Sequence, residues 1–317
     1  MMTSLVSALA RGMAKSRPSL LPVTIICTAI SFLTACSSLE KIRGVTGGVS
    51  DNPTRYYIPG GDASKTPLDW YRDEKELART WQAAMVRLPD SDGGVVNTTT
   101  HSSAFRNWQS DSLLPVVIYL HGCAGFWEGS HFRMNWLAEK GFAVIAPNSL
   151  ARIYYPSSCD PASFRSGLYR PTMVMRQLDA AYAVTQVRQL PWIDAQNIFL
   201  MGLSEGAAVT AMMDNSGKPE QAVKARIVEA WGCRTGWSEY QGLAAPEAEP
   251  VLALVADRDK WYNNPWQSGN CAEFMSSTNG SVSHVVTRSP LQFGHELMQD
   301  EQIQSVVHEF LQAQLAR

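Results

Sequence analysis

Short apolar runs alternate with amphipathic stretches along most of this chain, and this alternation constrains the fold more than any other feature. It starts at about Trp70 and is typical of βαβ units built on a largely parallel sheet. The segments predicted as strands are 114–120, 142–146, 197–201, 226–231, 250–255 and 281–287. The segments predicted as helices are 131–140, 171–190, 207–213 and 301–315. This order predicts an α/β fold with a doubly wound, mostly parallel sheet and right-handed crossovers.

The segment before this domain has the composition of an export signal. An apolar run over 20–33 follows three basic residues, Arg11, Lys15 and Arg17. The run is too short for a comfortable transmembrane helix, which needs about 20 residues. It ends in Leu33-Thr34-Ala35-Cys36, which resembles the bacterial lipobox, whose cysteine is lipidated. The resemblance implies a lipoprotein signal peptide over 1–35 and a lipid anchor at Cys36; a plain cleaved signal is the alternative.

The residues after Cys36 bear on where such an anchor would hold the protein. Ser37, rather than aspartate, follows the cysteine, and by resemblance to enteric sorting this favours the periplasmic face of the outer membrane. Several acyl chains, with each methylene worth about 0.8 kcal/mol, hold a protein on a membrane durably. Glycines and prolines are frequent in the following stretch, so we predict a lipidated cysteine and tether over 36–75 and the folded domain over 76–317.

Composition and charge exclude several classes of protein. The chain is 45% hydrophobic and 18% charged, which is ordinary for a globular domain and excludes disordered and collagen-like chains. Its formal net charge is −2 and it contains no basic block, so nothing in the charge predicts a nucleic-acid partner. The histidines do not fall at zinc-ligand spacings, and we expect neither a metal nor an organic cofactor.

Four cysteines remain after the predicted anchor: Cys123, Cys159, Cys233 and Cys271. An even number of cysteines in an exported protein indicates disulfide bonds, although four cysteines allow three connectivities. Buried free thiols are the alternative. Because the domain is large enough to bury a core of its own, disulfides would restrain loops rather than hold the fold together.

A glycine-flanked serine stands between a predicted strand and a predicted helix, in Gly202-Leu203-Ser204-Glu205-Gly206. A serine on a tight strand-to-helix turn needs small neighbours because the backbone there is strained. The turn exposes the hydroxyl and directs the N-terminus of the next helix towards it, where free N–H groups favour negative charge. Ser204 is therefore the candidate nucleophile, and an ordinary glycine-rich turn is the alternative.

A serine hydroxyl is a poor nucleophile at neutral pH, so it needs a base, and the base needs an orienting acid. The strand predicted over 250–255 is followed by two aspartates, Asp257 and Asp259. The stretch Leu-Val-Ala-Asp-Arg-Asp-Lys-Trp resembles the α/β-hydrolase pattern in which the acid lies four residues past the end of the strand. That resemblance selects Asp259, with Asp257 as the alternative.

Three histidines follow these aspartates in the sequence. His284 falls within a predicted strand and His308 within a predicted helix, where a structural histidine is the commoner interpretation. His295 falls in Phe293-Gly294-His295, on the loop between the last strand and the last helix. A loop at that place brings an imidazole over the sheet edge, so His295 is the candidate base that takes the Ser204 proton.

The segment His121-Gly122-Cys123-Ala124-Gly125 directly follows the first predicted strand, where α/β-hydrolases place part of their oxyanion hole. We expect two backbone N–H groups to bind the developing oxyanion, those of Cys123 and Glu205. Cys123 is also a conceivable second nucleophile. No lysine or arginine lies near it in the sequence, however, and export favours a disulfide at this cysteine.

Together these motifs are similar to those of the dienelactone hydrolase family of α/β-hydrolases. The similar segments are HGCAG at 121, APNS at 146, GLSEG at 202, WGC at 231, ADRDKW at 256 and FGH at 293. The resemblance covers about 110–317 and implies a hydrolase of carboxylic esters or lactones that acts through an acyl-enzyme. Dienelactone hydrolase itself has a cysteine where this chain has Ser204, so its particular lactone substrate is not implied.

In the fold that this resemblance implies, Cys123 and Cys159 lie on loops after neighbouring strands, and so do Cys233 and Cys271. We therefore predict the disulfides Cys123–Cys159 and Cys233–Cys271.

Tryptophans are frequent near the predicted carboxyl ends of the strands, where ligands bind in such sheets: Trp127, Trp231, Trp237, Trp261 and Trp266. An aromatic mouth suits apolar acyl or aryl groups, and the chain has no long lid insertion, so we expect small to medium ester substrates. We expect only one or two of these tryptophans to touch the ligand. Two alternatives stay open: an amide or peptide hydrolase with the same triad, and a non-catalytic binding lipoprotein of the cell envelope.

Overall fold

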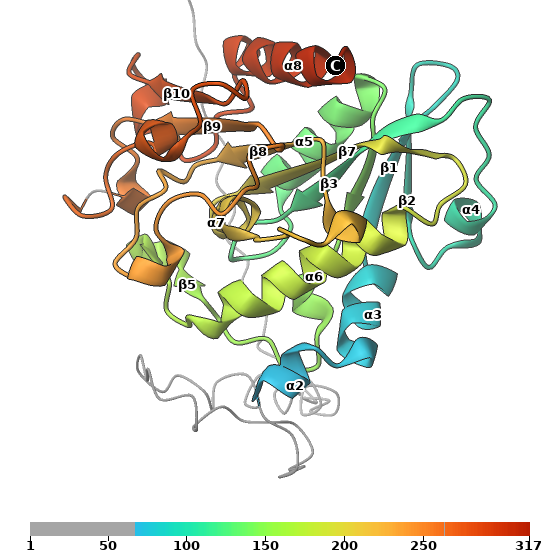
Figure 1. The fold of residues 1–317 in the computed structure, drawn as a ribbon, viewed down its shortest axis with the longest axis horizontal. Helices are drawn as coiled ribbons and strands as arrows, with labels where there is room; N and C mark the ends of the chain where they lie inside the picture. Colours follow the sequence, from blue (N-terminus) through green and yellow to red (C-terminus); the bar gives the residue numbers. More distant parts are fainter. Residues whose placement is uncertain (1–66, 263) are drawn as a thin grey trace, which may run out of the picture. The chain divides into compact units, whose positions relative to one another are not determined.

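A computed structural model describes residues 67–262 and 264–317 of the chain. The predicted signal peptide over 1–35, the lipidation candidate Cys36 and the tether as far as residue 66 lie outside this part. The described chain forms an eight-stranded sheet with the order β10-β9-β8-β7-β3-β4-β1-β2 (Figure 1). The strands are β1 (Met85–Pro89), β2 (Val95–Thr99), β3 (Leu114–Leu120), β4 (Ala143–Ala146), β7 (Ile193–Leu203), β8 (Ala225–Glu229), β9 (Val251–Ala256) and β10 (Val282–Val286).

Six of these strands are the six predicted from the sequence, and they pair in parallel. β1 runs antiparallel to its neighbours β2 and β4. The order 4-3-7-8-9-10 reverses direction between the two halves of the chain, so the sheet is doubly wound. The predicted α/β fold class is confirmed.

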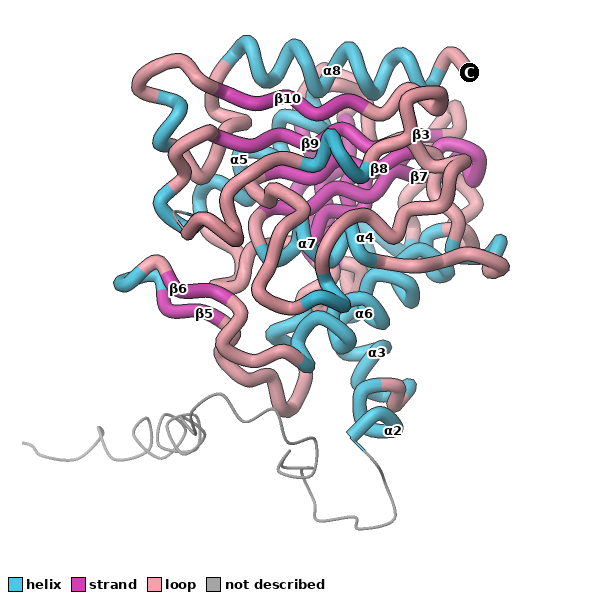
Figure 2. Tube along the Cα trace, turned by 60° about the vertical axis from the view of Figure 1, so that its left-hand side comes forward, coloured by secondary structure: helices cyan, strands magenta, loops and turns pink. Residues whose placement is uncertain are grey.

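Helices cover both faces of the sheet (Figures 1 and 2). On one face, α5 (Glu128–Glu139) and α8 (Glu301–Leu315) pack against residues such as Val117 and Tyr119 of β3. On the other face, α6 (Pro171–Val187) and α7 (Glu205–Met212) pack against Val116, Ile118 and Leu120 of the same strand. Because successive strand residues point to opposite faces, the continuous apolar run of β3 serves two cores.

The described part of the chain contains helices and strands that the sequence analysis did not predict. The helix α2 (Pro67–Tyr71) lies within the range 36–75 expected to be tether, and its Trp70 and Tyr71 are buried in a small core with Met175 of α6. α3 (Glu74–Gln82), β1, β2 and α4 (Ser103–Arg106) follow before the first predicted strand. β1 was missed because it carries a buried arginine, Arg87, which interrupts its apolar pattern.

Polar partners within the fold explain how β1 tolerates that arginine. Arg87 donates from Nε to Asn135 at 2.8 Å and from Nη2 to Nδ1 of His131 at 3.0 Å, so its guanidinium is hydrogen-bonded by α5. A buried charge is tolerated only with such partners. The sequence carries no local signal for them, since they lie more than 40 residues away along the chain.

Two disulfides restrain the loops at the carboxyl edge of the sheet. Cys123–Cys159 joins the loop after β3 to β5 (Cys159–Asp160), which pairs with β6 (Arg165–Ser166) in a two-stranded hairpin. Cys233–Cys271 joins the segments that follow β8 and β9. The Cα–Cα distances are 5.9 and 5.0 Å. Both predicted pairings are confirmed.

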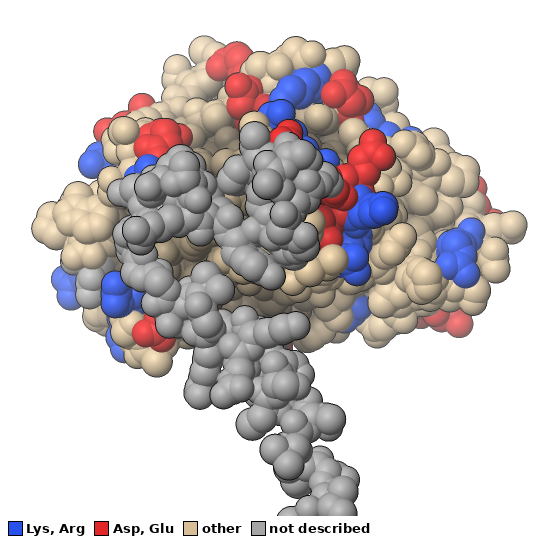
Figure 3. Space-filling model, turned by 90° about the horizontal axis from the view of Figure 1, so that it is seen from below, with Lys and Arg blue, Asp and Glu red and all other residues tan. Residues whose placement is uncertain are grey.

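Two further surface properties of the described part bear on partners. No helix in the described ranges is long and apolar enough to cross a membrane. On the visible part of the face in Figure 3, basic and acidic side chains are interspersed and do not gather into a region of one sign. This mixed surface agrees with the formal net charge of −2.

Candidate active site

Ser204 occupies a strained turn between β7 and α7. Its φ of 58° and ψ of −119° are backbone angles that residues other than glycine rarely adopt. A Cβ on Gly202 would stand 2.1 Å from the carbonyl oxygen of Gly206, and a Cβ on Gly206 would stand 2.2 Å from that of Leu120. Only glycine fits at either position, because both obstacles are backbone atoms. The turn is further fixed by the Ser204 N–H, which donates to the Glu229 carbonyl at 2.9 Å.

His295 and Asp259 meet above the same edge of the sheet. Asp259 follows β9 by three residues rather than the predicted four, and is 3% exposed. Its Oδ2 lies 2.6 Å from Nδ1 of His295, which stands between the short turn η8 (Leu291–Phe293) and α8. An ionised carboxylate only accepts hydrogen bonds, so Nδ1 carries the proton and Nε2 carries the lone pair. Nε2 is buried and has no hydrogen-bond partner among the described residues.

The other residues weighed for these roles lie elsewhere. Asp257 is exposed, and the nearest cation to it is Arg258 at 4.0 Å. His284 lies in β10 and His308 in α8, as their predicted elements require. Of the two aspartates and three histidines, the structure therefore brings together only Asp259 and His295.

Aromatic rings surround the imidazole. Trp261 stacks on His295 with ring centroids 5.2 Å apart and an angle of 29° between the planes. Phe164, from the hairpin tied by Cys123–Cys159, contacts Trp261 edge-on at 5.7 Å. Such rings exclude water and hold the imidazole in one orientation.

Tyr262 is a site residue that the sequence analysis missed. Its ring lies 6.0 Å from that of His295, and its N–H donates to the Asp259 carbonyl at 3.1 Å. Burial raises the pKa of Tyr262 well above its usual value of 10, and the charge of Asp259 raises it further. The available signal was its position three residues after the candidate acid.

The loop 121–125 lies against the serine. A Cβ on Gly122 would stand 3.8 Å from Cβ of Ser204. Within the described chain, the backbone N–H groups of Cys123 and Glu205 have no hydrogen-bond partner. That of Glu205 is free because the first N–H groups of a helix lack intrahelical acceptors. Cys123 is oxidised in the disulfide, so it has no thiolate to act as a second nucleophile.

A network of buried hydrogen bonds and ion pairs holds the loop 121–125 in place. The Glu205 carboxylate accepts from Arg176 at 2.7 Å and from the Tyr155 hydroxyl at 3.2 Å, and Arg176 also donates to the His121 carbonyl. Burial and the Arg176 charge lower the pKa of His121 to about 3. The ring is therefore neutral, and its Nδ1–H donates to the Gly122 carbonyl at 2.7 Å.

Glu229, at the end of β8, connects the serine turn to the histidine loop. Its main-chain carbonyl accepts from Ser204, and its Oε1 accepts from the N–H groups of Leu297 at 2.7 Å and Met298 at 3.1 Å. Arg133 of α5 neutralises the carboxylate with two hydrogen bonds of 2.7 and 2.6 Å. The sequence analysis missed this pair, because nothing local marks a charged residue at the end of a buried strand as a link between loops.

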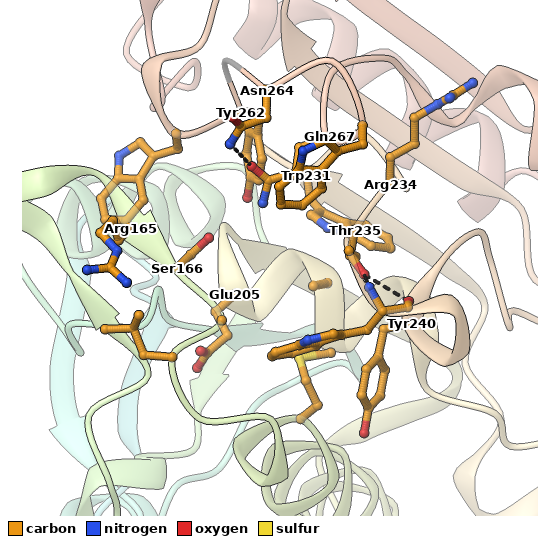
Figure 4. A pocket seen from close by; sticks show the side chains of 18 of the residues that line it. Arg165, Ser166, Glu205, Trp231, Arg234, Thr235, Tyr240, Tyr262, Asn264 and Gln267 are labelled. Atoms are coloured by element: carbon orange, nitrogen blue, oxygen red, sulfur yellow. Dashed lines mark hydrogen bonds between the residues drawn. The ribbon is translucent and has the colours of Figure 1, made fainter. Parts of the chain in front are cut away.

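A cavity of about 360 Å³ opens beside the site (Figure 4). Among its lining residues are the carboxylate-bearing Glu205, the guanidinium-bearing Arg165 and several aromatic side chains: Phe164, Trp231, Trp237, Tyr240, Trp261, Tyr262 and Trp266. Four of the five tryptophans expected at the mouth thus line it. Trp127 does not; it precedes α5 and is 55% exposed. The described residues include no group of three or more histidine, cysteine, aspartate or glutamate side chains placed to hold a metal ion.

The comparison with protein families agrees with this architecture. The model of the dienelactone hydrolase family matches residues 104–282, which is more than half of the chain. The chain belongs to the dienelactone hydrolase family. It is accordingly a hydrolase that acts on esters, with the α/β-hydrolase fold, as the sequence motifs predicted.

Solved structures of three hydrolases are similar to this chain. A dienelactone hydrolase-like promiscuous phosphotriesterase from metagenomic libraries has 15% identity and a TM-score of 0.45, with 73% of this chain and 98% of that chain covered. Esterase 2 of Thermogutta terrifontis has 16% identity and a TM-score of 0.42, covering 72% and 88%. A hyperthermophilic esterase from the archaeon Pyrobaculum calidifontis has 15% identity and a TM-score of 0.43, covering 90% and 99%. The search of curated proteins found no match.

Proposed function

We propose that this chain is a serine esterase in which Ser204 is the nucleophile, His295 the general base and Asp259 the orienting acid. The observation that carries this proposal is the 2.6 Å hydrogen bond from His295 Nδ1 to Asp259, which leaves Nε2 buried and without a hydrogen-bond partner among the described residues. The strained backbone of Ser204 supports it, since such strain persists only where the surroundings enforce it and clusters at active sites.

The proposed reaction proceeds through an acyl-enzyme. Oγ of Ser204 attacks the ester carbonyl carbon while its proton passes to Nε2 of His295, and the carbonyl electron pair moves to the oxygen. The backbone N–H groups of Cys123 and Glu205 bind that oxyanion, each worth on the order of 10²–10³ in turnover. Nε2 then protonates the departing alcohol, and a water molecule repeats the sequence on the acyl-enzyme. No metal or organic cofactor takes part in these steps.

The cavity supports small to medium esters with apolar acyl or aryl groups as substrates. Its volume of about 360 Å³ lies at the small end of ligand sites, and most of its named walls are aromatic rings. Irregular segments tied by the two disulfides form these walls.

Labelling with a fluorophosphonate probe tests the proposed nucleophile and base. We expect wild type to be labelled and to hydrolyse p-nitrophenyl acetate, and Ser204→Ala and His295→Ala to lose both activities. His284→Ala, which removes a half-buried histidine from β10, is the matched control and should keep both. Hydrolysis that survives in folded Ser204→Ala would refute the proposal.

We also propose that the enzyme is anchored through a lipid on Cys36 at the periplasmic face of the outer membrane. The support is the lipobox-like sequence that ends at Cys36, together with two disulfides, which are typical of exported proteins. Wild type grown with radiolabelled palmitate should become labelled and fractionate with outer membranes. Equal labelling of Cys36→Ala would contradict this localisation.

A further inference from the structure

One buried arginine is bonded to both of the backbone segments that carry the proposed oxyanion donors. Arg176 of α6 donates from Nη1 to the Glu205 carboxylate at 2.7 Å and from Nη2 to the His121 carbonyl. Its side chain is 1% exposed, and that of Glu205 is 7% exposed. We propose that Arg176 is a positioning residue, which fixes the two oxyanion-binding N–H groups relative to each other and compensates the charge of Glu205 beside them. The inference rests on the proposed function of Ser204.

The two donor segments are in backbone contact at the place where Arg176 reaches them. A Cβ on Gly206 would stand 2.6 Å from the His121 carbonyl oxygen, which is the atom that accepts from Arg176. A guanidinium is planar and rigid, so bonds from its two Nη atoms hold their two acceptors at a defined separation. Arg176 therefore sets the distance between the start of α7 and the loop that follows β3.

The first donor is aimed by a residue that Arg176 holds. The Cys123 N–H belongs to the same peptide group as the Gly122 carbonyl, which accepts from the His121 ring at 2.7 Å and from the Gly125 N–H at 3.1 Å. In a planar trans peptide the N–H and the carbonyl point in opposite directions, so these two bonds set the direction of the Cys123 N–H. Because Arg176 binds the main chain of His121, a shift of the guanidinium would turn this donor.

The second donor, the Glu205 N–H, belongs to a residue that is held at its main chain and at its side chain. The Ser204 carbonyl of the same peptide group accepts from the Ala208 N–H at 3.0 Å. The Glu205 carboxylate accepts from Arg176 and from the Tyr155 hydroxyl at 3.2 Å. The same arginine thus restrains the residues on which both donors depend.

The charge of Glu205 would oppose the reaction if it were not compensated. Glu205 lines the cavity and directly follows the proposed nucleophile (Figure 4). Negative charge develops on the substrate oxygen in the transition state, and a like charge nearby in a site of low dielectric repels it. The guanidinium of Arg176, at 2.7 Å from the Glu205 carboxylate, removes most of that repulsion.

Arg226 of β8 offers a matched control at the other end of α7. It is fully buried, is ion-paired with Glu249 at 2.5 Å and donates to the carbonyls of Thr210 and Met213 at 2.8 and 2.7 Å. Like Arg176, it joins a carboxylate to main-chain carbonyls, but these carbonyls belong to the last turn of α7 and its C-cap. Both Arg176→Lys and Arg226→Lys keep the charge and lose the rigid fork, so both should lower the melting temperature.

Only the Arg176 variants should lose catalytic rate. On p-nitrophenyl acetate we expect kcat to fall about 10-fold in Arg176→Lys and about 100-fold in Arg176→Gln, with KM nearly unchanged, because misplaced donors lose part of the 10²–10³ that each contributes. Inhibition by a trifluoromethyl ketone, whose adduct with a serine places an oxyanion in the same hole, should weaken by the factor by which kcat/KM falls. Arg226→Lys should keep the wild-type kcat, KM and inhibition. Arg176→Lys carries the test if Arg176→Gln fails to fold.

A double variant separates the charge from the geometry. Arg176→Gln leaves the Glu205 carboxylate uncompensated, whereas the combination of Arg176→Gln with Glu205→Gln carries neither charge. We expect the double variant to recover about 10-fold of the kcat that Arg176→Gln loses. A double variant no more active than Arg176→Gln would overturn the compensation of charge.

The role of Arg176 is overturned if its folded variants keep the wild-type kcat, if only their KM changes, or if Arg226→Lys loses as much kcat as Arg176→Lys. These outcomes are distinct from failure of the proposed function. An inactive Ser204→Ala beside fully active Arg176 variants removes only the role of Arg176, whereas an active Ser204→Ala removes the proposed function itself.

Discussion

The two sides of the active site are built in different ways. The serine turn and the loop 121–125 follow β7 and β3, adjacent strands in the middle of the sheet that pair in parallel and are buried on both faces. The substrate walls come from irregular segments with short helical turns, each joined by a disulfide to a neighbouring loop. Under the proposed function, the regular framework positions the nucleophile and the oxyanion-binding N–H groups, and the tied segments select the substrate. It predicts that damage to the two sides will have different signatures.

The largest effect is expected from Gly206→Ala, on the framework side. The new Cβ would stand 2.2 Å from the Leu120 carbonyl oxygen, and backbone on both sides of the contact leaves no room to move. We expect destabilisation of about 4 kcal/mol or more together with loss of probe labelling. Gly94→Ala, whose Cβ would meet its nearest neighbour at 3.8 Å, is the control and should stay folded and active in thermal melts and assays. A stable, active Gly206→Ala enzyme would show that the turn is not fixed by its packing.

The next largest effect is expected from Glu229→Gln, which breaks the link between the serine turn and the histidine loop. The variant removes the fully buried charge partner of Arg133 and leaves it with the ion pair to Glu296 at 2.8 Å, so we expect a loss at the lower end of the roughly 3–5 kcal/mol that breaking a buried pair costs. Chemical denaturation measures this loss. The exposed Asp257→Asn variant should unfold like wild type. Equal stabilities of Glu229→Gln and wild type would show that the Arg133–Glu229 pair does not stabilise the fold.

On the wall side, the paired change Cys123→Ser with Cys159→Ser should act mainly on substrate binding. The disulfide closes a separation of 36 residues, so its loss costs about 3–4 kcal/mol if the unfolded chain is the state restrained. Because the hairpin carries Phe164 and Arg165 of the cavity wall, we expect KM to rise more than kcat falls. The same double change at Cys233 and Cys271 is the companion variant. A fall in kcat with unchanged KM would show that the hairpin supports the chemical step rather than substrate binding.

The smallest effect concerns pH. His121 has its pKa lowered to about 3 in the folded protein, from 6.5 when unfolded, so the unfolded state binds a proton that the folded state excludes. Stability from this residue is full above pH 6.5 and falls by roughly 1.4 kcal/mol per unit as the pH drops towards 3. Urea unfolding at pH 7 and pH 5 measures the slope. His121→Asn should flatten it, while His101→Asn, which removes an exposed histidine, should not.

The sequence predicted the framework well because its signals are local. The apolar run of β3 coincides with the strand, and the glycines around Ser204 mark the turn by a steric requirement that acts within five residues. The disulfide pairs were also predictable, once the strand order was implied by the family. What was missed depends on distant partners: Arg87 is satisfied by α5, and Glu229 is joined to the histidine loop.

Trp127 shows the limit of placing residues by strand ends alone. It lies on a loop at the expected edge, yet it directly precedes α5 and does not line the cavity, whereas the four other tryptophans do. The edge of a sheet is longer than a single cavity, so a residue can lie at the edge without lining the pocket. The irregular segments decide which part of the edge forms the pocket, and the periodicity of a sequence does not encode their course.

The double attachment of Glu229 has a practical consequence for redesign. Glu229, at the end of β8, is hydrogen-bonded both to the serine turn and to the loop that begins after His295. The sheet therefore sets the distance between the proposed nucleophile and the proposed base. The cavity-wall segments 164–168 and 234–240 are not part of this connection. New substrates can thus be sought by exchanging these wall segments wholesale, with the reactive atoms left at their original spacing.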